Sequence, residues 1–346
     1  MTFTAADLMA PELPPIRWVV PGLLPEGVTL LAGKPKLGKS WLALGVAVAV
    51  ANGGVALGKK RVDQGEVLYL ALEDNQRRLQ KRMRKLLGGA RAPEGLHIST
   101  AWPRVDEGGE EALEGWIADR LDARLVVVDV LKRVRPRTSR FQGVYDADYE
   151  SLEALHAFAE RHGVAVLCVH YLRKAGAADP VDEISGSTGL SGAADGVLVL
   201  KRDRGRGDAY LHVDGRDIEE PAELALTWDP NTASWTLAGD AEQYRLSESR
   251  AEIREVLEAI GKFMTPTEVA EVLSKDPNTV RQRLWHMSRD GQVLANDGRY
   301  AAILNDRNPR NREPKESVTA VTQATHNAFD LEHPMRATGE PLHHGV

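Results

Sequence analysis

The feature that most constrains the fold of this chain is a short string that matches the pattern G-x-x-x-x-G-K-[ST]. It consists of Gly33, Lys34, Pro35, Lys36, Leu37, Gly38, Lys39 and Ser40. An apolar run at residues 28–32 precedes the string, and a helix-like stretch at residues 40–51 follows it. A strand, a glycine-containing loop and a helix in this order predict a phosphate-binding loop. A glycine turn before a core helix is the simpler alternative, but the order of the elements favours nucleotide binding.

The residues of this string have distinct expected roles. Gly33 and Gly38 let the backbone approach a phosphate where a Cβ atom would obstruct it. Backbone N–H groups and the positive end of the helix dipole would surround the β-phosphate. Lys39 would reach the β- and γ-phosphates, and the Ser40 hydroxyl would hold Mg²⁺. Together with Trp41, which follows directly, these residues form the expected nucleotide-binding segment.

Apolar runs alternate with amphipathic stretches from residue 28 to about residue 239. The expected strands are residues 28–32, 66–72, 125–130, 164–170 and 196–200. Four of them are nearly unbroken Val, Leu and Ala, which is typical of parallel strands covered on both faces. Helical spacing of apolar residues predicts helices at 75–87 and 146–162. The alternation predicts an α/β core, and shorter runs beyond Arg202 predict an antiparallel extension at the sheet edge.

Two acidic residues and a histidine stand at the carboxyl ends of expected strands. They are Glu73, Asp129 and His170, and this end of an open α/β sheet faces the ligand crevice. A nucleoside triphosphatase needs a carboxylate near the metal and a group that orients the attacking water. Asp129 fits the first role and Glu73 the second, although either acid could instead cap the following helix. A lone histidine is more often structural, but its position favours a hydrogen bond from His170 to the γ-phosphate or its water.

A second, smaller unit is expected at residues 246–304, after a main domain at residues 16–240 and an N-terminal segment at residues 1–15. Apolar stripes predict three short helices, and an Asn-Asp-Gly turn at residues 296–298 predicts a β-hairpin. Three helices and a hairpin indicate a winged helix-turn-helix domain. The sequence leaves open whether this domain binds DNA, docks a protein or packs as an appendage. Residues 305–346 show no periodicity and predict a disordered tail.

The composition excludes several classes of protein. Of the 346 residues 42% are hydrophobic, which is enough for a core and excludes a wholly disordered chain. The net charge of −6 argues against a protein that is basic throughout but allows a local basic groove. Cys168 is the one cysteine, so neither a disulfide framework nor a Cys-rich zinc site is expected. The apolar stretch at residues 41–51 is too short to span a bilayer, and the N-terminus does not resemble a signal peptide. We therefore expect a soluble, cytoplasmic protein without a membrane partner.

The order of these motifs resembles that of the RecA-like ATPases, in which a phosphate loop precedes strands that end in Glu, Asp and His. Three stretches are most similar to the RepA-type hexameric replicative helicases of plasmids and phages. They are GKPKLGKSWLAL from Gly33, EVLYLALEDNQRRLQ from Glu66 and SGSTGLSGAAD from Ser185. The resemblance extends over about residues 16–239. It implies a RecA-like P-loop NTPase core in a homo-hexameric ring that hydrolyses ATP with Mg²⁺ and translocates on single-stranded DNA during replication.

The resemblance also implies roles for individual residues. Lys39 and Ser40 take the phosphate and Mg²⁺ roles, and Asp129 completes the metal shell. Glu73 becomes the catalytic base, and His170 becomes the γ-phosphate sensor. A primase or another replisome protein is the implied partner of the ring.

An arginine finger supplied by the neighbouring subunit is part of the same resemblance. Several basic residues follow the fifth expected strand, and Arg202 and Arg216 are the leading candidates among them. A finger of this kind contributes about 10³- to 10⁵-fold to turnover.

Two segments are expected to contact single-stranded DNA. The loop from Lys132 to Arg140 carries five basic side chains and no acid, within an otherwise acidic chain. Placed after Asp129, it would line the centre of a ring and follow a DNA backbone. A solvated loop is the alternative, but the position and the sign of the charge favour DNA. The segment from Arg173 to Gly192, rich in Gly, Ser and Ala, would be its mobile partner.

Two other functions are compatible with the sequence. A recombination mediator of the RecA or RadA type would share the fold and the site and would differ in forming open filaments instead of closed rings. A DNA-binding regulator would use the ATPase core as a switch and the winged helix for specificity.

Overall fold

The computed structural model describes residues 2–137, 144–172, 188–202 and 208–303. The chain forms two compact units, Met1–Ala251 and Glu252–Val346. The division falls within helix α7 (Ala241–Ile260). The predicted disordered tail at residues 305–346 lies outside the described residues.

A nine-stranded sheet organises the first unit, with the strand order β13-β12-β11-β10-β3-β9-β8-β6-β7. Six neighbouring strands are parallel: β10 (Gly196–Lys201), β3 (Gly27–Gly33), β9 (Ala165–Tyr171), β8 (Ala123–Asp129), β6 (Glu66–Ala71) and β7 (Leu96–Ser99). Each expected strand of the core is present to within two residues at either end, and β7 is an additional strand that the sequence did not predict. The prediction of a parallel-dominated α/β core is confirmed.

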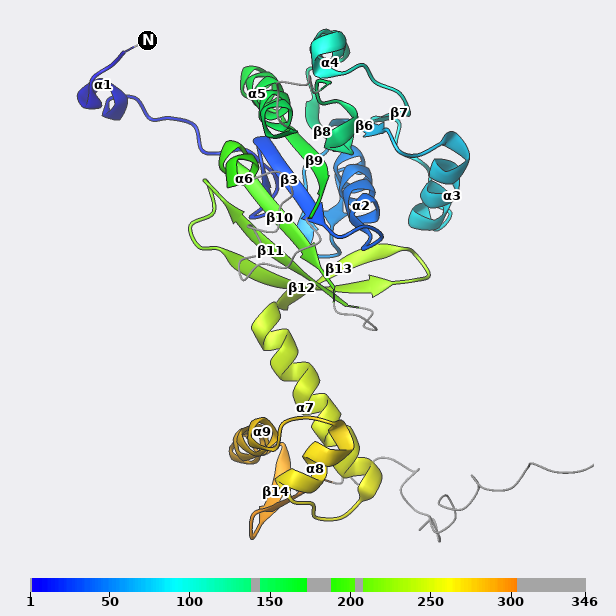
Figure 1. Ribbon diagram of the computed structural model, residues 1–346, viewed down its shortest axis with the longest axis vertical. Coiled ribbons are helices and arrows are strands. Elements are labelled where there is room, and N and C mark those ends of the chain that lie inside the picture. The colour runs from blue at the N-terminus through cyan, green and yellow to red at the C-terminus, as the bar shows by residue number, and fades with distance from the viewer. Residues whose placement is uncertain (1, 138–143, 173–187, 203–207, 304–346) are drawn as a thin grey trace, which may run out of the picture. The chain divides into compact units, whose positions relative to one another are not determined.

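Helices cover both faces of the parallel part of the sheet (Figure 1). One face packs against α2 (Lys39–Asn52) and α3 (Gln76–Leu87). The other packs against α4 (Gly109–Ile117), α5 (Val144–His162) and α6 (Thr188–Ala193). On β3, Val28, Leu30 and Ala32 contribute to the second layer of core and Leu31 to the first. Because successive side chains of a strand point to opposite faces, both sets must be apolar, which explains the unbroken apolar runs.

The predicted antiparallel extension is also present at the sheet edge. It consists of β11 (Ala209–Gly215), β12 (Ala222–Asp229) and β13 (Ser234–Asp240), each antiparallel to its neighbour. Shorter elements complete the unit. They are α1 (Ala5–Met9), β1 (Trp18–Val20), β2 (Leu24–Pro25), β4 (Val55–Ala56), β5 (Lys60–Arg61), and the 3-10 turns η1 (Val105–Glu107) and η2 (Leu131–Arg133).

The second unit has a small apolar core of its own. The C-terminal part of α7 packs there with α8 (Pro266–Leu273), α9 (Pro277–Arg289) and the hairpin of β14 (Val293–Asn296) and β15 (Arg299–Ala302). Thr265 caps α8, and its hydroxyl and backbone N–H bond reciprocally with Glu268. Asp297 and Gly298 have the positive φ angles of 45° and 71° that the hairpin turn requires.

The helices of both units are short or carry charged side chains. Over the described ranges of the chain, none of them is both long and apolar enough to cross a membrane.

Candidate active site

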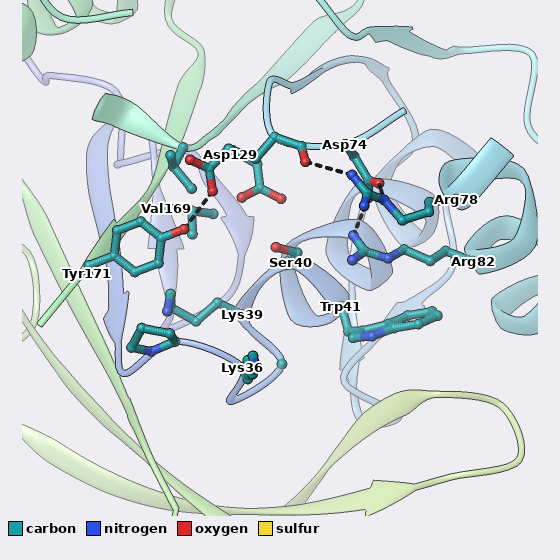
Figure 2. A pocket seen from close by; sticks show the side chains of 14 residues that line it. Lys36, Lys39, Ser40, Trp41, Asp74, Arg78, Arg82, Asp129, Val169 and Tyr171 are labelled. Atoms are coloured by element: carbon teal, nitrogen blue, oxygen red, sulfur yellow. Dashed lines mark hydrogen bonds and ion pairs between the residues drawn. The ribbon is translucent and has the colours of Figure 1, made fainter. Parts of the chain in front are cut away.

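A cavity of about 500 Å³ lies at the carboxyl ends of β3, β6, β8 and β9. Figure 2 shows its lining side chains. They are Pro35, Lys36, Gly38, Lys39, Ser40, Trp41, Glu73, Asp74, Arg78, Arg82, Asp129, Val130, Val169 and Tyr171. The structure therefore brings most of the predicted phosphate loop together with both predicted carboxylates.

The phosphate loop has the backbone geometry that its sequence predicts. Gly38 has a φ of +100° and immediately precedes α2, whose first turn begins at Lys39. A Cβ atom on Gly33 would lie 2.9 Å from the carbonyl oxygen of Leu200 and 3.2 Å from Cδ of Lys39. A larger residue at Gly33 would therefore push the lysine stem or β10 away, so the loop can close only around glycine.

Lys39 lies buried at the centre of this loop. Its Nζ donates to the carbonyl oxygens of Gly33 at 2.7 Å and Lys34 at 3.0 Å. Burial lowers the pKa of Lys39 to about 8, against the opposing effect of the negative charges of Asp129 and Glu73. Lys39 is therefore mostly charged at neutral pH, but it loses its proton at a lower pH than an exposed lysine does.

This pKa predicts a pH-dependent affinity for ATP. The protonated lysine binds a phosphate, so above pH 8 binding must be accompanied by uptake of a proton. We expect the association constant to be nearly constant just below pH 7.5 and to fall by up to about tenfold per pH unit above pH 8.5. Titration calorimetry in two buffers of different ionisation enthalpy measures both the affinity and the proton uptake.

A Lys39→Arg variant is the matched control, because an arginine stays charged over this range. The variant should bind ATP more weakly, and its affinity should not change with pH over this range. A flat profile in the unaltered protein between pH 7.5 and 9.5 would contradict the assignment of Lys39.

Asp129 is buried at the end of β8 and accepts a hydrogen bond from Tyr69 Oη at 2.8 Å. Burial raises the pKa of Asp129, and hydrogen bonds from Tyr69 and Ser40 counteract the shift. Burying a carboxylate removes its hydration, which costs free energy unless a cation or hydrogen-bond donors compensate the charge.

The donors at this point fit Mg²⁺. The Ser40 hydroxyl and the Asp129 carboxylate are hard oxygen ligands, and Mg²⁺ is usually held by one or two protein oxygens together with waters and phosphates. In the described part of the chain, no group of three or more His, Cys, Asp or Glu side chains could hold a metal by itself.

Glu73 lies just beyond β6 and is engaged on both carboxylate oxygens. Tyr171 Oη donates to Oε2 at 2.6 Å, and Arg133 Nε lies 3.4 Å from Oε1. Glu73 does not cap the helix that follows it. Asn75 caps α3 instead, because its side chain accepts a hydrogen bond from the backbone N–H of Arg78. The position of Glu73 is compatible with orienting a water opposite Lys39.

Asp74 has a different environment from Glu73. It pairs with Arg78 at 2.5 Å and with Arg82 at 2.6 Å, both from α3. The guanidinium of Arg82 also lies 5.4 Å from the ring centroid of Trp41. Asp74 therefore orients two arginines along the wall of the cavity.

The predicted placement of His170 beside Glu73 and Asp129 is not what the structure has. Val169 and Tyr171, its neighbours on β9, line the cavity, whereas His170 does not. Because side chains alternate along a strand, His170 belongs to the opposite face, the same face as Cys168 and Leu172. The strand end was predicted correctly, but the residue that reaches the site is Tyr171.

The two arginine-finger candidates lie at opposite ends of the sheet. Arg202 follows β10 at the carboxyl end, with its guanidinium 5.8 Å from the ring centroid of Trp235. Arg216 lies at the other end, where it contacts Asp195 at 3.3 Å and the carbonyl oxygen of Gly192 at 3.0 Å. Neither candidate lines the cavity of its own chain.

Part of the first predicted DNA loop is held against the core. Arg133 pairs with Glu73, and Arg137 Nε lies 3.3 Å from Glu107. The side chain of Arg104 donates to the backbone carbonyl of Arg135. Residues 138–140 of this loop, and residues 173–187 of the second predicted loop, lie outside the described residues.

Several residues of the site have no signal in the sequence. Tyr69 and Tyr171 bind the two carboxylates, and Trp235 donates from Nε1 to the carbonyl oxygen of Gly38 at 3.2 Å. Trp235 also packs against Trp228 of the neighbouring strand. The sheet extension thus supports the phosphate loop across 197 residues of sequence, a contact that no local pattern predicts.

A phosphate loop, two strand-end carboxylates and a parallel-dominated sheet together resemble the core of the RecA-like P-loop ATPases. Residues 1–177 match the family model described as AAA domain, and the chain belongs to this family. No curated protein matches the sequence.

Solved structures share the fold at low sequence identity. One of them, an ATPase domain, is 15% identical, with a TM-score of 0.50 over 61% of this chain and 84% of that one. A DnaB-like replicative helicase, solved in a study of its interactions with primase, is 14% identical, with a TM-score of 0.51 over 61% of this chain and 57% of that one. At this identity the similarity concerns the fold alone.

Proposed function

We propose that the protein is an ATP-dependent DNA helicase of the RepA type that translocates on single-stranded DNA during replication. The observation that carries the proposal is the meeting of Lys39, Ser40, Glu73 and Asp129 in one cavity. This cavity lies on a core whose fold is shared with an ATPase domain and with a DnaB-like replicative helicase. A primase or another replisome protein is the proposed partner.

Hydrolysis at this cavity would rest on positioning and electrostatics, as in other phosphoryl transfers. Lys39 would bind the phosphate oxygens, and Ser40 and Asp129 would hold Mg²⁺, which neutralises phosphate charge when bound. Glu73 would orient the attacking water and accept its proton. The bond from Tyr69 holds Asp129 at the cavity, and the bond from Tyr171 holds Glu73 before a nucleotide binds.

A strand-displacement assay on a forked duplex, with and without ATP, tests the proposal directly. Displacement that requires hydrolysable ATP is the expected result. ATP hydrolysis without displacement would instead favour the recombination mediator.

The loop from Lys132 to Arg140 is the proposed contact with the DNA backbone. The loop begins beside the site, because Arg133 contacts Glu73. A DNA strand bound to the loop would therefore lie close to the candidate base. Arg137 is exposed on the same loop. Positive charge at these positions supports the proposal that binding of the strand influences hydrolysis.

Charge reversal of Arg135 and Arg137 to Glu is expected to weaken single-strand binding and to flatten its salt dependence. Loss of two phosphate contacts should lower the slope of log K against log salt by about 1.4. Fluorescence anisotropy with a labelled oligonucleotide, at salt concentrations between about 50 and 200 mM, gives both quantities. The double variant Arg91→Glu/Lys262→Glu changes the net charge equally at exposed sites elsewhere. Equal slopes in the two double variants would remove the loop from DNA binding.

Assembly into a homo-hexameric ring, with ATP between subunits, is the proposed quaternary structure. We place the arginine finger at Arg202, which lies at the carboxyl end of the sheet, in preference to Arg216, which Asp195 and Gly192 hold at the other end. The mass in solution with nucleotide distinguishes a closed six-subunit species from open filaments.

A second candidate function is favoured by α9 in the proposed winged-helix domain. Its exposed face carries Arg281, Gln282, His286 and Arg289, and the helix contains no acidic residue. Side chains of these types read base edges when a helix enters the major groove. Sequence-specific binding of duplex DNA by the full chain, independent of ATP, would favour an ATP-switched regulator over the helicase.

A further inference from the structure

Tyr171, the last residue of β9, contacts both ends of the proposed reaction centre. Its hydroxyl donates to Glu73 Oε2 at 2.6 Å, and Lys39 Nζ lies 4.9 Å from the centroid of its ring. Figure 2 shows the ring between Lys39 and the acidic side of the cavity. One side chain therefore joins the phosphate-loop lysine to the candidate base.

The space that this ring takes is the space that hydrolysis needs. A P-loop lysine acts on the β- and γ-phosphates, and the base acts on a water in line with the γ-phosphate. The γ-phosphate and its water must therefore lie between Lys39 and Glu73. In this structure Tyr171 contacts both of these residues. The ammonium group of Lys39 donates to the carbonyl oxygens of Gly33 and Lys34.

We propose that Tyr171 closes the γ-phosphate position, so that ATP must displace its side chain whereas ADP need not. The inference rests on the proposed function, because it assigns a γ-phosphate to this cavity. It makes Tyr171 the positioning residue through which β9 distinguishes ATP from ADP, in the place where the sequence predicts His170.

A triphosphate that takes the place of the Tyr171 ring must break both contacts of this side chain. The hydroxyl bonds a carboxylate, and the ring faces an ammonium group, so each contact includes a charged partner. Burial, and then the hydrogen bond to Glu73 and its negative charge, raises the pKa of Tyr171. The hydroxyl therefore remains a donor throughout the physiological pH range and holds Glu73 until the side chain leaves.

Displacement of Tyr171 would be felt beyond the site. Leu172, the next residue, donates its backbone N–H to the carbonyl oxygen of Gly33, and the second predicted DNA segment follows. The other oxygen of Glu73 contacts Arg133, in the first predicted DNA loop. Movement of Tyr171 would thus release Glu73 and shift the start of a DNA-facing segment in one event.

The test compares affinities for a non-hydrolysable ATP analogue and for ADP, measured by titration calorimetry on the full chain. Tyr171→Phe removes the bond to Glu73, and Tyr171→Leu also removes the ring over Lys39. We expect the analogue to bind about tenfold more tightly relative to ADP in Tyr171→Phe. A further gain of about threefold is expected in Tyr171→Leu, with the ADP affinity unchanged in both.

Tyr149→Phe, on α5 and outside the cavity lining, is the matched control and should leave the ratio unchanged. An unchanged ratio in Tyr171→Phe, or an equal loss of affinity for both nucleotides, would overturn the role of Tyr171. Failure of the proposed function would give a different result. The unaltered protein would then bind nucleotide without hydrolysing it, and the ratio of the two affinities could still be measured.

Discussion

Replacing Glu73 by Gln is expected to lower ATP turnover by about 10²- to 10⁴-fold without weakening ATP binding. Glutamine has the size of glutamate and can still accept the hydrogen bond from Tyr171, so the shape of the site is kept. It lacks the negative charge and cannot take up the proton of an attacking water. Steady-state hydrolysis and equilibrium binding, measured on the same preparation, separate the two effects.

Glu94→Gln is the control for loss of one negative charge. Glu94 is exposed and pairs with Arg91 on the surface, outside the cavity lining. This variant should hydrolyse ATP at the rate of the unaltered protein. Hydrolysis by Glu73→Gln at the normal rate would remove Glu73 from the role of base.

Replacing Asp195 by Ala is expected to lower the free energy of unfolding of the first unit by about 3 kcal/mol. Asp195 is buried, and its Oδ2 accepts the backbone N–H of Val28 at 2.8 Å. Its Oδ1 lies 3.1 Å from Nε2 of His156 and 3.3 Å from Arg216. The substitution would leave a buried donor at the start of β3 without an acceptor and would release α5 and the end of β11 together.

Urea unfolding followed by tryptophan fluorescence measures this effect. The signal reports on the first unit, because Trp285 is the one tryptophan outside it. Asp195→Asn keeps an oxygen for the N–H of Val28 and should be less destabilised than Asp195→Ala. Asp217→Ala, at an exposed position close in sequence, should change the unfolding free energy by less than about 0.5 kcal/mol. Equal stabilities of Asp195→Ala and Asp217→Ala would show that the network around Asp195 does not hold the strand.

The phosphate loop and the strands around it could be predicted because their signals are local. The G-x-x-x-x-G-K-[ST] string requires a particular backbone, and Gly38 adopts the left-handed conformation that only glycine takes readily. The helix cap at Thr265 is likewise made by residues three positions apart in the chain. Such features need no knowledge of what packs against them.

The partners of the site residues could not be predicted in this way. Asp129 and Tyr69 are 60 residues apart, Glu73 and Tyr171 are 98 apart, and Gly38 and Trp235 are 197 apart. These contacts exist because the sheet order brings β6, β8, β9 and the antiparallel extension around one loop. Strand order depends on pairing between distant segments, which local propensity does not encode.

By itself the sequence determined the class of fold, the phosphate loop and the acidic strand ends, because each follows from short-range backbone and hydrophobic requirements. Only the tertiary structure decided that Tyr171 reaches the cavity and His170 does not. In a strand covered on one face, the alternation of polar and apolar residues reveals which side chains face inward. β9 is covered by helices on both faces and is apolar at almost every position. The hydrophobic pattern of β9 therefore does not show which side chains point to which face, and packing alone selects the residue that faces the site.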